Sequence, residues 1–399
     1  MWQRTKNIFH LFQAISANIY FGLPGRKLII IGVTGTDGKT TTVNIIYHIL
    51  KTAGKHVSIV STTGATIHGK ESHLAFHVTN PASWPLQKFL HEAAKSNYRE
   101  NYIVLEVSSH GIDQNRIWGI PFTVGIVTNI TPEHLDYHKT YDEYLRTKTK
   151  LLKSAKITIV NKDDNSYKKI MHILKDKSVI TYGMGSDVDV NEMIFPYQSP
   201  LIGDFNRYNI LAAISACKSL GLTDAEIAKG IKTFTTPLGR MNKISNKRGI
   251  DIIVDYAHTA NGIKQALTAL KQQSKGKLIA IIGGEGYRDE KKRPIIGEVA
   301  TTLANYVIIT AVDPRGLQDE INKEILRGVK KAGGKIGKNI FVIDDRKEAI
   351  DFAINSLAKK GDTVSMFGKG HERSMNIDGK HEIPWSEYEA VASALKSAK

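Results

Sequence analysis

One short segment near the start of the chain contains the residue types that bind phosphate. Residues 32–42 read Gly-Val-Thr-Gly-Thr-Asp-Gly-Lys-Thr-Thr-Thr. They follow an apolar stretch at 27–32 and precede apolar positions with helical spacing, at Val43, Ile46, Tyr47 and Leu50. In a strand–loop–helix unit of this kind, backbone N–H groups and the helix dipole attract an anion, and glycines let the backbone come close to it. The segment predicts a site for a nucleoside triphosphate.

Three side chains in and near this segment could act on the phosphates. Lys39 can reach the outer phosphates, and the hydroxyl of Thr40 can ligate Mg²⁺. Glu106 lies near the end of a second apolar stretch, 102–107. A carboxylate at the carboxyl end of a neighbouring strand could complete a Mg²⁺ site made of oxygen ligands. The spacing departs from the common G-x-x-x-x-G-K-[ST] pattern, because Val33 stands where the first glycine would be. We expect a nucleoside triphosphate and Mg²⁺ as cofactors.

Composition restricts the class of protein. The chain has 399 residues, 41% hydrophobic and 24% charged, as expected of a globular enzyme with two or three domains. Its single cysteine, Cys217, excludes a disulfide framework and a cysteine-based zinc site, and fits the reducing cytoplasm. The net charge of +16 favours anionic partners. Because basic residues neither cluster in a run nor alternate with aromatic ones, we expect small anionic molecules rather than nucleic acid as partners.

The first 25 residues form a separate segment. Apolar residues are interspersed there with Arg4, Lys6 and Gln13, which predicts an amphipathic helix. The apolar run is too short and interrupted to span a bilayer, and no cleavage site of a secretory signal follows it. We expect this helix to pack on the enzyme, with loose contact to a membrane surface as the alternative.

Beyond residue 25, β-rich stretches alternate with helical ones, which predicts an α/β fold with mostly parallel sheets. The expected strands of the first part are 27–32, 56–60, 102–107, 124–128 and 157–161, and its helices are 40–52, 84–97, 142–154, 206–220 and 223–234. The expected strands of the second part are 251–255, 278–283, 306–310, 340–343 and 363–367, and its helices are 261–273, 293–304, 320–332, 347–359 and 387–398. Pro237 and Gly239 mark a boundary between the two parts. We therefore predict an N-terminal helix at 1–25, a central P-loop ATPase domain at 26–236 and a Rossmann-like C-terminal domain at 237–399.

Several motifs, in order along the chain, resemble those of the Mur ligases. They most resemble the MurE type, which adds the third amino acid of the peptidoglycan stem peptide. The motifs are Gly35–Thr41, Glu106–Gly111 with Gln114 and Arg116, Asn129–His138, Asp204–Ala213, Gly239–Met241, Asp255–Thr259, Arg288–Asp289 with Lys292–Pro294, Asp313–Arg315 and Gly368–Glu372. The resemblance implies a monomeric cytoplasmic ligase that uses ATP to form an acyl phosphate, which an amine then attacks. Its substrates would be a UDP-muramoyl peptide and a diamino acid.

The resemblance also implies roles for individual residues. The catalytic and metal-binding residues would be Lys39, Thr40, Glu106, His134 and a carbamylated Lys148. ATP would contact Gly35, Thr36, Asp37, Gly38, Lys39, Thr40 and Thr41 of the loop, together with Asn209, Arg240, Asp255 and His258. The anionic substrate would contact Thr79, Asn80, Ser108, Gln114 and Arg116, and the amino acid would contact Arg288, Asp313, Arg315, Gly368 and Glu372. Because Arg240 and Asp255 lie beyond residue 237, ATP would be shared between the two domains, whose closure would assemble the site.

Two assignments stay open from the sequence. A carbamate is favoured only beside metal ions, and Lys150 in the same stretch competes with Lys148 for that role. The arginine in Val312-Asp-Pro-Arg315 favours a second carboxylate on the amino acid, and so meso-diaminopimelate over lysine. Diaminopimelate enzymes usually read Asp-Asn-Pro-Arg at this point, which leaves lysine as the alternative.

The chain also departs from the family pattern elsewhere. Asn80 stands in place of a threonine, Asn242 in place of a glutamate and Asp37 in place of an asparagine. MurE-type enzymes hold the uridine diphosphate in an N-terminal domain, whereas only 31 residues precede Gly32, so recognition of the uridine end is open.

Three other functions are alternatives to a MurE-type ligase. A folylpolyglutamate synthase-like or cyanophycin synthetase-like ligase is disfavoured by the motifs at 106–111 and 313–315. The synthetase-like subunit of a lipid-linked amidotransferase needs a four-cysteine zinc site, which a single cysteine cannot make. A nucleotide-binding module without catalysis is disfavoured because four residues are intact: Lys39, Glu106, His134 and Lys148.

Overall fold

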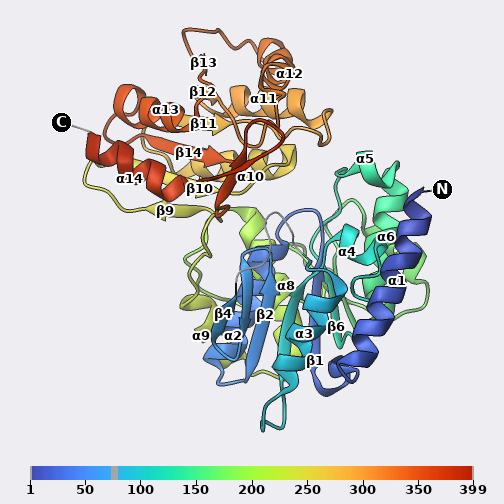
Figure 1. Cartoon of the computed structure of the whole chain (residues 1–399). Helices are drawn as coiled ribbons and strands as arrows, with labels where there is room; N and C mark the ends of the chain where they lie inside the picture. Colours follow the sequence, from blue (N-terminus) through green and yellow to red (C-terminus); the bar gives the residue numbers. More distant parts are fainter. Residues whose placement is uncertain (1, 73–79, 398–399) are drawn as a thin grey trace. The chain divides into compact units, whose positions relative to one another are not determined.

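The computed structural model describes residues 2–72 and 80–397, and of residues 2–4 only the backbone. The chain divides into two compact units, Met1–Thr235 and Thr236–Lys399 (Figure 1). Each unit contains its own sheet with helices on both faces, so the predicted α/β class with mostly parallel sheets is confirmed.

The first unit is built on an eight-stranded sheet with the order β4-β3-β2-β5-β1-β6-β7-β8. The strands are β1 (Ile29–Thr34), β2 (Val57–Ser61), β3 (Gly64–Ile67), β4 (Lys70–Ser72), β5 (Tyr102–Glu106), β6 (Val124–Val127), β7 (Ile157–Asn161) and β8 (Ile180–Tyr182). All neighbours are parallel except those that involve β3 and β4, which form antiparallel pairs at one edge. In the centre, β1 lies between β5 and β6, so the loop after β1 opens between the ends of two neighbouring strands.

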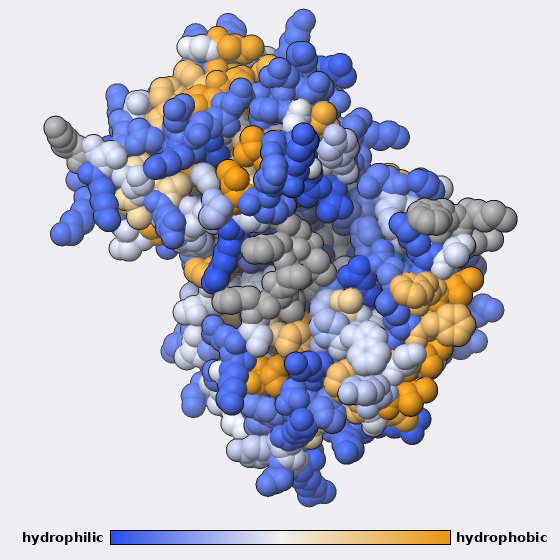
Figure 2. Space-filling view, in the orientation of Figure 1, coloured by the Kyte–Doolittle hydropathy of each residue, from blue (hydrophilic) through white to orange (hydrophobic). Residues whose placement is uncertain are grey.

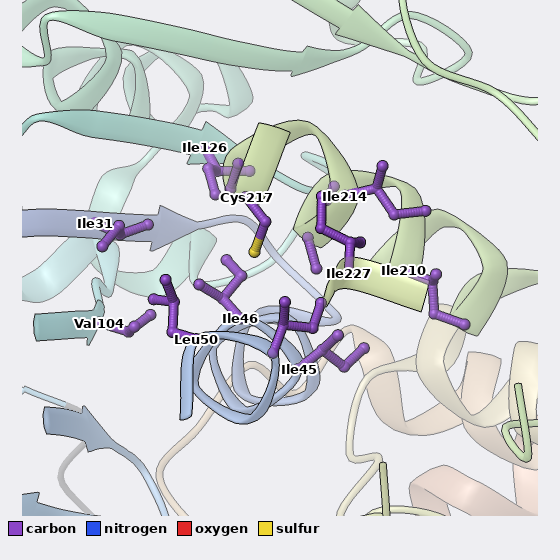
Figure 3. Packing of buried hydrophobic residues seen from close by; sticks show 14 of the residues in the cluster. Ile31, Ile45, Ile46, Leu50, Val104, Ile126, Ile210, Ile214, Cys217 and Ile227 are labelled. Carbon is purple, nitrogen blue, oxygen red and sulfur yellow. The ribbon is translucent and has the colours of Figure 1, made fainter. Parts of the chain in front are cut away.

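Helices cover both faces of this sheet because its central strands are nearly continuous apolar runs, whose successive side chains point to opposite faces. On one face Ile31 packs with the apolar sides of α2 (Lys39–Thr52), α8 (Asp204–Ser219) and α9 (Asp224–Lys232), as Figure 3 shows for ten labelled residues. On the other face Ile30 packs with α3 (Ser83–Ala94) and α6 (Tyr141–Ser154). The remaining helical segments are α1 (Trp2–Tyr20), the 3₁₀ turn η1 (Pro24–Lys27), α4 (Ser109–Asp113), α5 (Leu135–His138) and α7 (Tyr167–Leu174).

The second unit contains a six-stranded sheet with the order β13-β12-β11-β14-β10-β9. Its strands are β9 (Asn242–Ile244), β10 (Asp251–Asp255), β11 (Leu278–Ile282), β12 (Tyr306–Ile309), β13 (Ile340–Val342) and β14 (Thr363–Phe367), and a separate hairpin pairs β15 (Ser374–Asn376) with β16 (Glu382–Pro384). Its helices are α10 (Ala260–Gln273), α11 (Lys292–Leu303), α12 (Gln318–Lys331), α13 (Arg346–Asp351) and α14 (Glu387–Ser397). All strands but β9 are parallel, and β14 returns between β11 and β10, which produces a topological switch point.

Two details of the second unit differ from, or add to, the sequence prediction. The helix expected at 347–359 runs as an α-helix only to Asp351 and continues as a π-helix, η2 (Phe352–Leu357). Arg346 is fully buried and forms an ion pair with Glu387, which ties α13 to α14. The same guanidinium donates to the carbonyl oxygens of Phe367 and Ala311, at 2.9 and 3.2 Å. Helix α14 is therefore attached to the ends of the sheet by a buried ion pair whose guanidinium also binds two backbone carbonyl groups.

The contact between α11 and α12 predicts a stability test. A Cβ at Gly328 would lie 1.7 Å from the carbonyl oxygen of Pro294, because the two helices meet at this glycine. We expect Gly328→Ala to destabilise the protein by about 1–3 kcal/mol through overpacking, even though alanine is the better helix former. Thermal or denaturant unfolding measures the effect. The matched control is Gly185→Ala, where nothing lies within 4 Å of the added carbon. Equal stability of the two variants would contradict this account of the helix contact.

Candidate active site

The segment predicted to bind phosphate forms a tight loop between β1 and α2. Gly35 and Gly38 have φ values of 151° and 82°, which other residues rarely adopt. A Cβ at Gly38 would lie 2.2 Å from Oδ1 of Asn209, and one at Gly35 would lie 1.8 Å from Oγ1 of Thr128. Both glycines are therefore required by close neighbours as well as by the backbone.

Residues that follow β6 hold this loop in place. The hydroxyl of Thr128 donates to the carbonyl oxygen of Asp37 at 2.6 Å, and the N–H of Asp37 donates to Oδ1 of Asn129 at 3.0 Å. The hydroxyl of Thr36 donates to the carbonyl oxygen of Thr131 at 3.1 Å. Sequence reasoning did not identify Thr128, although it marks the end of a predicted strand.

Glu106 lies against the helix end of the loop. It is 2% exposed, and its register with Val33 across β5 and β1 places it beside the loop. The hydroxyl of Thr40 lies 3.1 and 3.0 Å from its two carboxylate oxygens, and the backbone N–H of Thr62 donates to it at 2.9 Å. Lys39 donates to the carbonyl oxygen of Thr36 at 2.8 Å. The structure thus brings together the three residues that the sequence assigned to the phosphates.

Lys148 reaches the opposite side of the loop from α6. It is 2% exposed, and its Nζ donates to the carbonyl oxygen of Gly35 at 2.6 Å. Burial, and after it the charge of Lys39, hold the pKa of Lys148 well below its usual range. Lys150 is exposed. Between the two lysines that the sequence left open, the geometry favours Lys148.

His134 belongs to a group of packed aromatic rings at and around α5. It has a φ of 56°, and its ring centroid lies 4.8 Å from that of His110. The ring of His138 packs at 5.2 Å from Tyr144, and burial lowers the pKa of His138 to about 4. His138 is therefore neutral at physiological pH. Sequence reasoning missed His110 and His138, although both lie within the motifs it quoted.

The donor set at the loop fits Mg²⁺. A hydroxyl and a carboxylate, on Thr40 and Glu106, are hard oxygen ligands of the kind that this ion prefers. Within residues 2–72 and 80–397, no three His, Cys, Asp or Glu side chains converge as a ready-made metal cage. An ion at this position would therefore draw its other ligands from phosphate oxygens and water, as Mg²⁺ commonly does.

Four of the five residues predicted to contact the anionic substrate form one connected group. The side-chain oxygen of Asn80 accepts from the N–H and the hydroxyl of Ser108, at 2.6 and 2.8 Å. Arg116 donates to the carbonyl oxygen of Asn80 at 2.6 Å and to Oε1 of Gln114 at 2.7 Å. The amide of Asn80 also donates to the carbonyl oxygen of Glu106 at 2.6 Å, which joins this group to the loop site. Thr79, the fifth residue, lies outside the described residues.

The nucleotide residues predicted in the second unit lie at the carboxyl end of β10. Both carboxylate oxygens of Asp255 accept backbone N–H groups at 2.7 Å, from Met241 and Ala257. Burial raises the pKa of Asp255, and the nearby Arg240 opposes that shift. The guanidinium of Arg240 lies 4.7 Å from the centre of the Tyr256 ring, and His258 bonds the carbonyl oxygen of that tyrosine at 3.0 Å. Their role toward a nucleotide stays a prediction.

A pocket opens at the switch point of the second sheet. It is lined by Ala257, His258, Ile263, Gly283, Gly284, Glu285, Lys292, Val312, Phe367 and Gly368. Sequence reasoning missed Glu285, whose carboxylate lies 3.7 Å from Nε of Arg288. Burial alone would raise the pKa of Glu285, but nearby cations, chiefly Lys292, lower it below its usual range. The pocket therefore contains a charged carboxylate beside its cations.

The other residues predicted to hold the amino acid surround a buried lysine. Nζ of Lys369 lies 3.2 Å from Oδ1 of Asp313 and 2.6 Å from Oε2 of Glu372. Nη2 of Arg315 lies 4.0 Å from Oδ2 of Asp313. Lys369 is fully buried, and its two ion pairs offset the cost of burying its charge. The sequence pointed to Gly368 and Glu372 but not to the lysine between them.

Comparison with known proteins agrees with this geometry. Residues 33–217 match the Mur ligase middle domain, and residues 239–370 match the Mur ligase, glutamate ligase domain. The chain is 34% identical to the UDP-N-acetylmuramoyl-L-alanyl-D-glutamate–2,6-diaminopimelate ligase 1 of Clostridium acetobutylicum, over 96% of this chain and 81% of that protein. This chain belongs to the Mur ligase family.

Other relatives of this Mur ligase support the same placement. A ligase with the same diaminopimelate name from Geobacillus thermodenitrificans is 34% identical, over 97% of this chain and 82% of that protein. A solved structure of a UDP-N-acetylmuramoyl-L-alanyl-D-glutamate–2,6-diaminopimelate ligase is 30% identical, with a TM-score of 0.61 over 93% of this chain and 78% of that one. MurF from Acinetobacter baumannii, at 18% identity and a TM-score of 0.70 over 96% and 81%, shows the shared fold alone.

The burial of Lys148 in this Mur ligase leads to a prediction. An amine with a lowered pKa is neutral more of the time than an ordinary lysine, and a neutral amine can attack CO₂ and lose a proton to become a carbamate. We expect Lys148→Ala to be nearly inactive in ADP release, and short carboxylic acids to restore part of the activity by replacing the anion. Carbon NMR with labelled bicarbonate should show the carbamate in the unmodified enzyme.

Lys150→Ala is the matched control for this test, because Lys150 lies on the same helix but is exposed. It should keep its activity. Normal turnover by Lys148→Ala, or a loss confined to Lys150→Ala, would show that Lys148 has no such role.

Proposed function

We propose that this chain is an ATP-dependent ligase that joins a diamino acid, meso-diaminopimelate, to UDP-N-acetylmuramoyl-L-alanyl-D-glutamate in peptidoglycan precursor synthesis. The observation that carries the proposal is the 34% identity that extends through both units to relatives named for this reaction. The hydrogen bond of Lys39 to the loop at Thr36 and the contact of Thr40 with Glu106 support the ATP-dependent step. We further propose Mg²⁺ as the metal and a monomer in the cytoplasm as the working form.

The proposed reaction has two steps. The substrate carboxylate takes the γ-phosphoryl group of ATP, which leaves ADP and forms an acyl phosphate. The amine of the amino acid then attacks the acyl carbon and loses a proton, and phosphate departs as the amide forms. Bound Mg²⁺ would neutralise charge on the phosphates, held by Thr40 and Glu106. Lys39 would offset the charge that develops on the transferred group.

The charges around the switch-point pocket support a zwitterionic acceptor. Arg288 and Arg315 can pair with carboxylates, while Asp313 and Glu372 can pair with ammonium groups. Glu285 faces Arg288, so one of the two cations has a carboxylate nearby within the chain itself. Arg315 lies 4.0 Å from Asp313, at the outer limit for an ion pair. Arg315 is therefore a better candidate than Arg288 to bind the second carboxylate of the acceptor.

The loop residues yield the first test of the proposal. Lys39→Ala and Glu106→Gln should each lower the rate of substrate-dependent ADP release by at least ~10²-fold, since each removes a charge oriented toward the transferred phosphoryl group. Lys51→Ala, on an exposed position of the same helix α2, should turn over normally. Wild-type rates in both loop variants would exclude a catalytic role for the loop.

The acceptor is tested by comparing kcat/KM for meso-diaminopimelate and lysine. Leaving a buried cation without its carboxylate costs about 2–5 kcal/mol, and the low end of this range applies to Arg315, whose side chain is 22% exposed. Diaminopimelate should therefore be preferred by roughly 30-fold or more, at about 1.4 kcal/mol per factor of ten. Arg315→Ala should reduce this preference, whereas Arg327→Ala, an exposed arginine on α12, should preserve it. A preference for lysine that Arg315→Ala leaves unchanged would reject diaminopimelate as the acceptor.

A further inference from the structure

The N-terminal helix α1 exposes its large apolar side chains. The exposed fractions are 56% for Ile8, 61% for Phe9, 64% for Phe12, 65% for Ile19 and 72% for Tyr20. At about 100° per residue, these positions lie within one side of the helix. Figure 2 shows hydrophobic atoms gathered along α1 on the surface of the first unit. A surface helix normally buries such a face against its own domain.

The opposite side of α1 is attached by small and amide residues instead. Ala14 and Ala17 are fully buried there. The amide of Asn7 donates to Oδ2 of Asp113 at 2.9 Å, and that of Asn18 donates to the carbonyl oxygen of Trp118 at 3.2 Å. Helix α1 is therefore attached to the first unit through this opposite side. Its apolar face takes no part in the attachment.

The apolar face continues onto helix α3. Trp84 is 40% exposed, and its ring lies 5.3 Å from that of Tyr20 and 6.0 Å from that of Phe21. Tryptophan and tyrosine combine an apolar ring with a polar group, and they are enriched where a membrane meets water. We call this surface the α1 face; it consists of Ile8, Phe9, Phe12, Ile19, Tyr20 and Trp84.

The charges around the α1 face are predominantly positive. Helix α1 contains no Asp or Glu, and Lys6 is exposed on it. Lys88 lies one turn after Trp84 on the same side of α3, and Lys95 directly follows this helix; both are exposed. The one nearby acid on that helix, Glu92, is paired with Lys95 at 3.0 Å. With a chain charge of +16, two copies meeting at this face would bring like charges together.

We propose that the α1 face binds an anionic lipid surface, with α1 lying in the plane of the interface. An apolar helix face bordered by lysines is the pattern of such interfacial helices. In the described part of the chain no helix is long and apolar enough to cross a membrane. The proposed contact consists of apolar side chains that enter the interface and of attraction between lysines and lipid headgroups.

Vesicle co-sedimentation of the full chain tests this proposal. Vesicles of phosphatidylcholine with phosphatidylglycerol should bind the protein, and vesicles of phosphatidylcholine alone should bind it more weakly. The double variant Phe9→Ser with Phe12→Ser should lower binding at least about tenfold, since two buried aromatic side chains are lost. Its ADP release and thermal unfolding should be unchanged, because neither residue contacts the loop site or the interior.

The matched control replaces two apolar residues that are equally exposed elsewhere, Met193→Ser with Ile336→Ser, at 72% and 68% exposure. This variant should bind vesicles like the unmodified chain. Failure of the unmodified chain to bind anionic vesicles would overturn the proposal. A dimer of the unmodified chain in sedimentation velocity, lost in the Phe9/Phe12 variant, would also overturn the proposal. In that case a second copy of the chain would cover the α1 face. Vesicle binding requires no ligase activity, so this result is independent of the proposed reaction.

Discussion

The fixed backbone of the loop at residues 35–38 is the constraint on which the first unit depends. Hydrogen bonds from Thr128 and Asn129 hold Asp37, and close contacts with Thr128 and Asn209 leave no room for a side chain at either glycine. The loop is thereby shaped before any ligand arrives. A preorganised set of backbone N–H groups costs no rearrangement when charge develops on a phosphate.

Several elements converge on this loop because β1 is central in its sheet. Glu106 comes from β5 on one side of β1, Thr128 follows β6 on the other, and Lys148 reaches the loop from α6 beneath. Asn80 then connects the loop site to the Ser108 and Arg116 group through the carbonyl oxygen of Glu106. In the second unit, the fully buried Lys369 forms ion pairs with Asp313 and Glu372 beside the pocket. The loop site depends on hydrogen bonds instead, because Glu106 accepts from Thr40 and Thr62, and Lys148 donates to Gly35.

Local sequence patterns predicted most of the helices and strands. Two kinds of feature were missed: very short strands, and residues whose important neighbours are distant in sequence. The parallel strands were found because they are nearly continuous apolar runs, and β7, β10 and β14 have the predicted bounds. The short strands β3, β4, β8, β9, β15 and β16 were missed, because three or four residues give too little periodicity to recognise. The loop, Glu106 and Lys148 were identified from motifs. Glu285 and Lys369 were not, because their importance arises from neighbours that only folding brings close.

The attachment of α1 has a geometric consequence for the first unit. Asp113 accepts hydrogen bonds from Asn7 on α1 and from the hydroxyl of Tyr137 on α5, at 2.9 and 2.8 Å. Tyr137 in turn lies 4.3 Å from the ring of His110 and receives a bond from Gln114 at 3.4 Å. Helix α1 is thus fixed to the elements that carry His110, Gln114 and Tyr137, without a flexible tether between them. A bilayer that binds the α1 face would therefore orient the first unit as a rigid body, at a set angle and height above the headgroups.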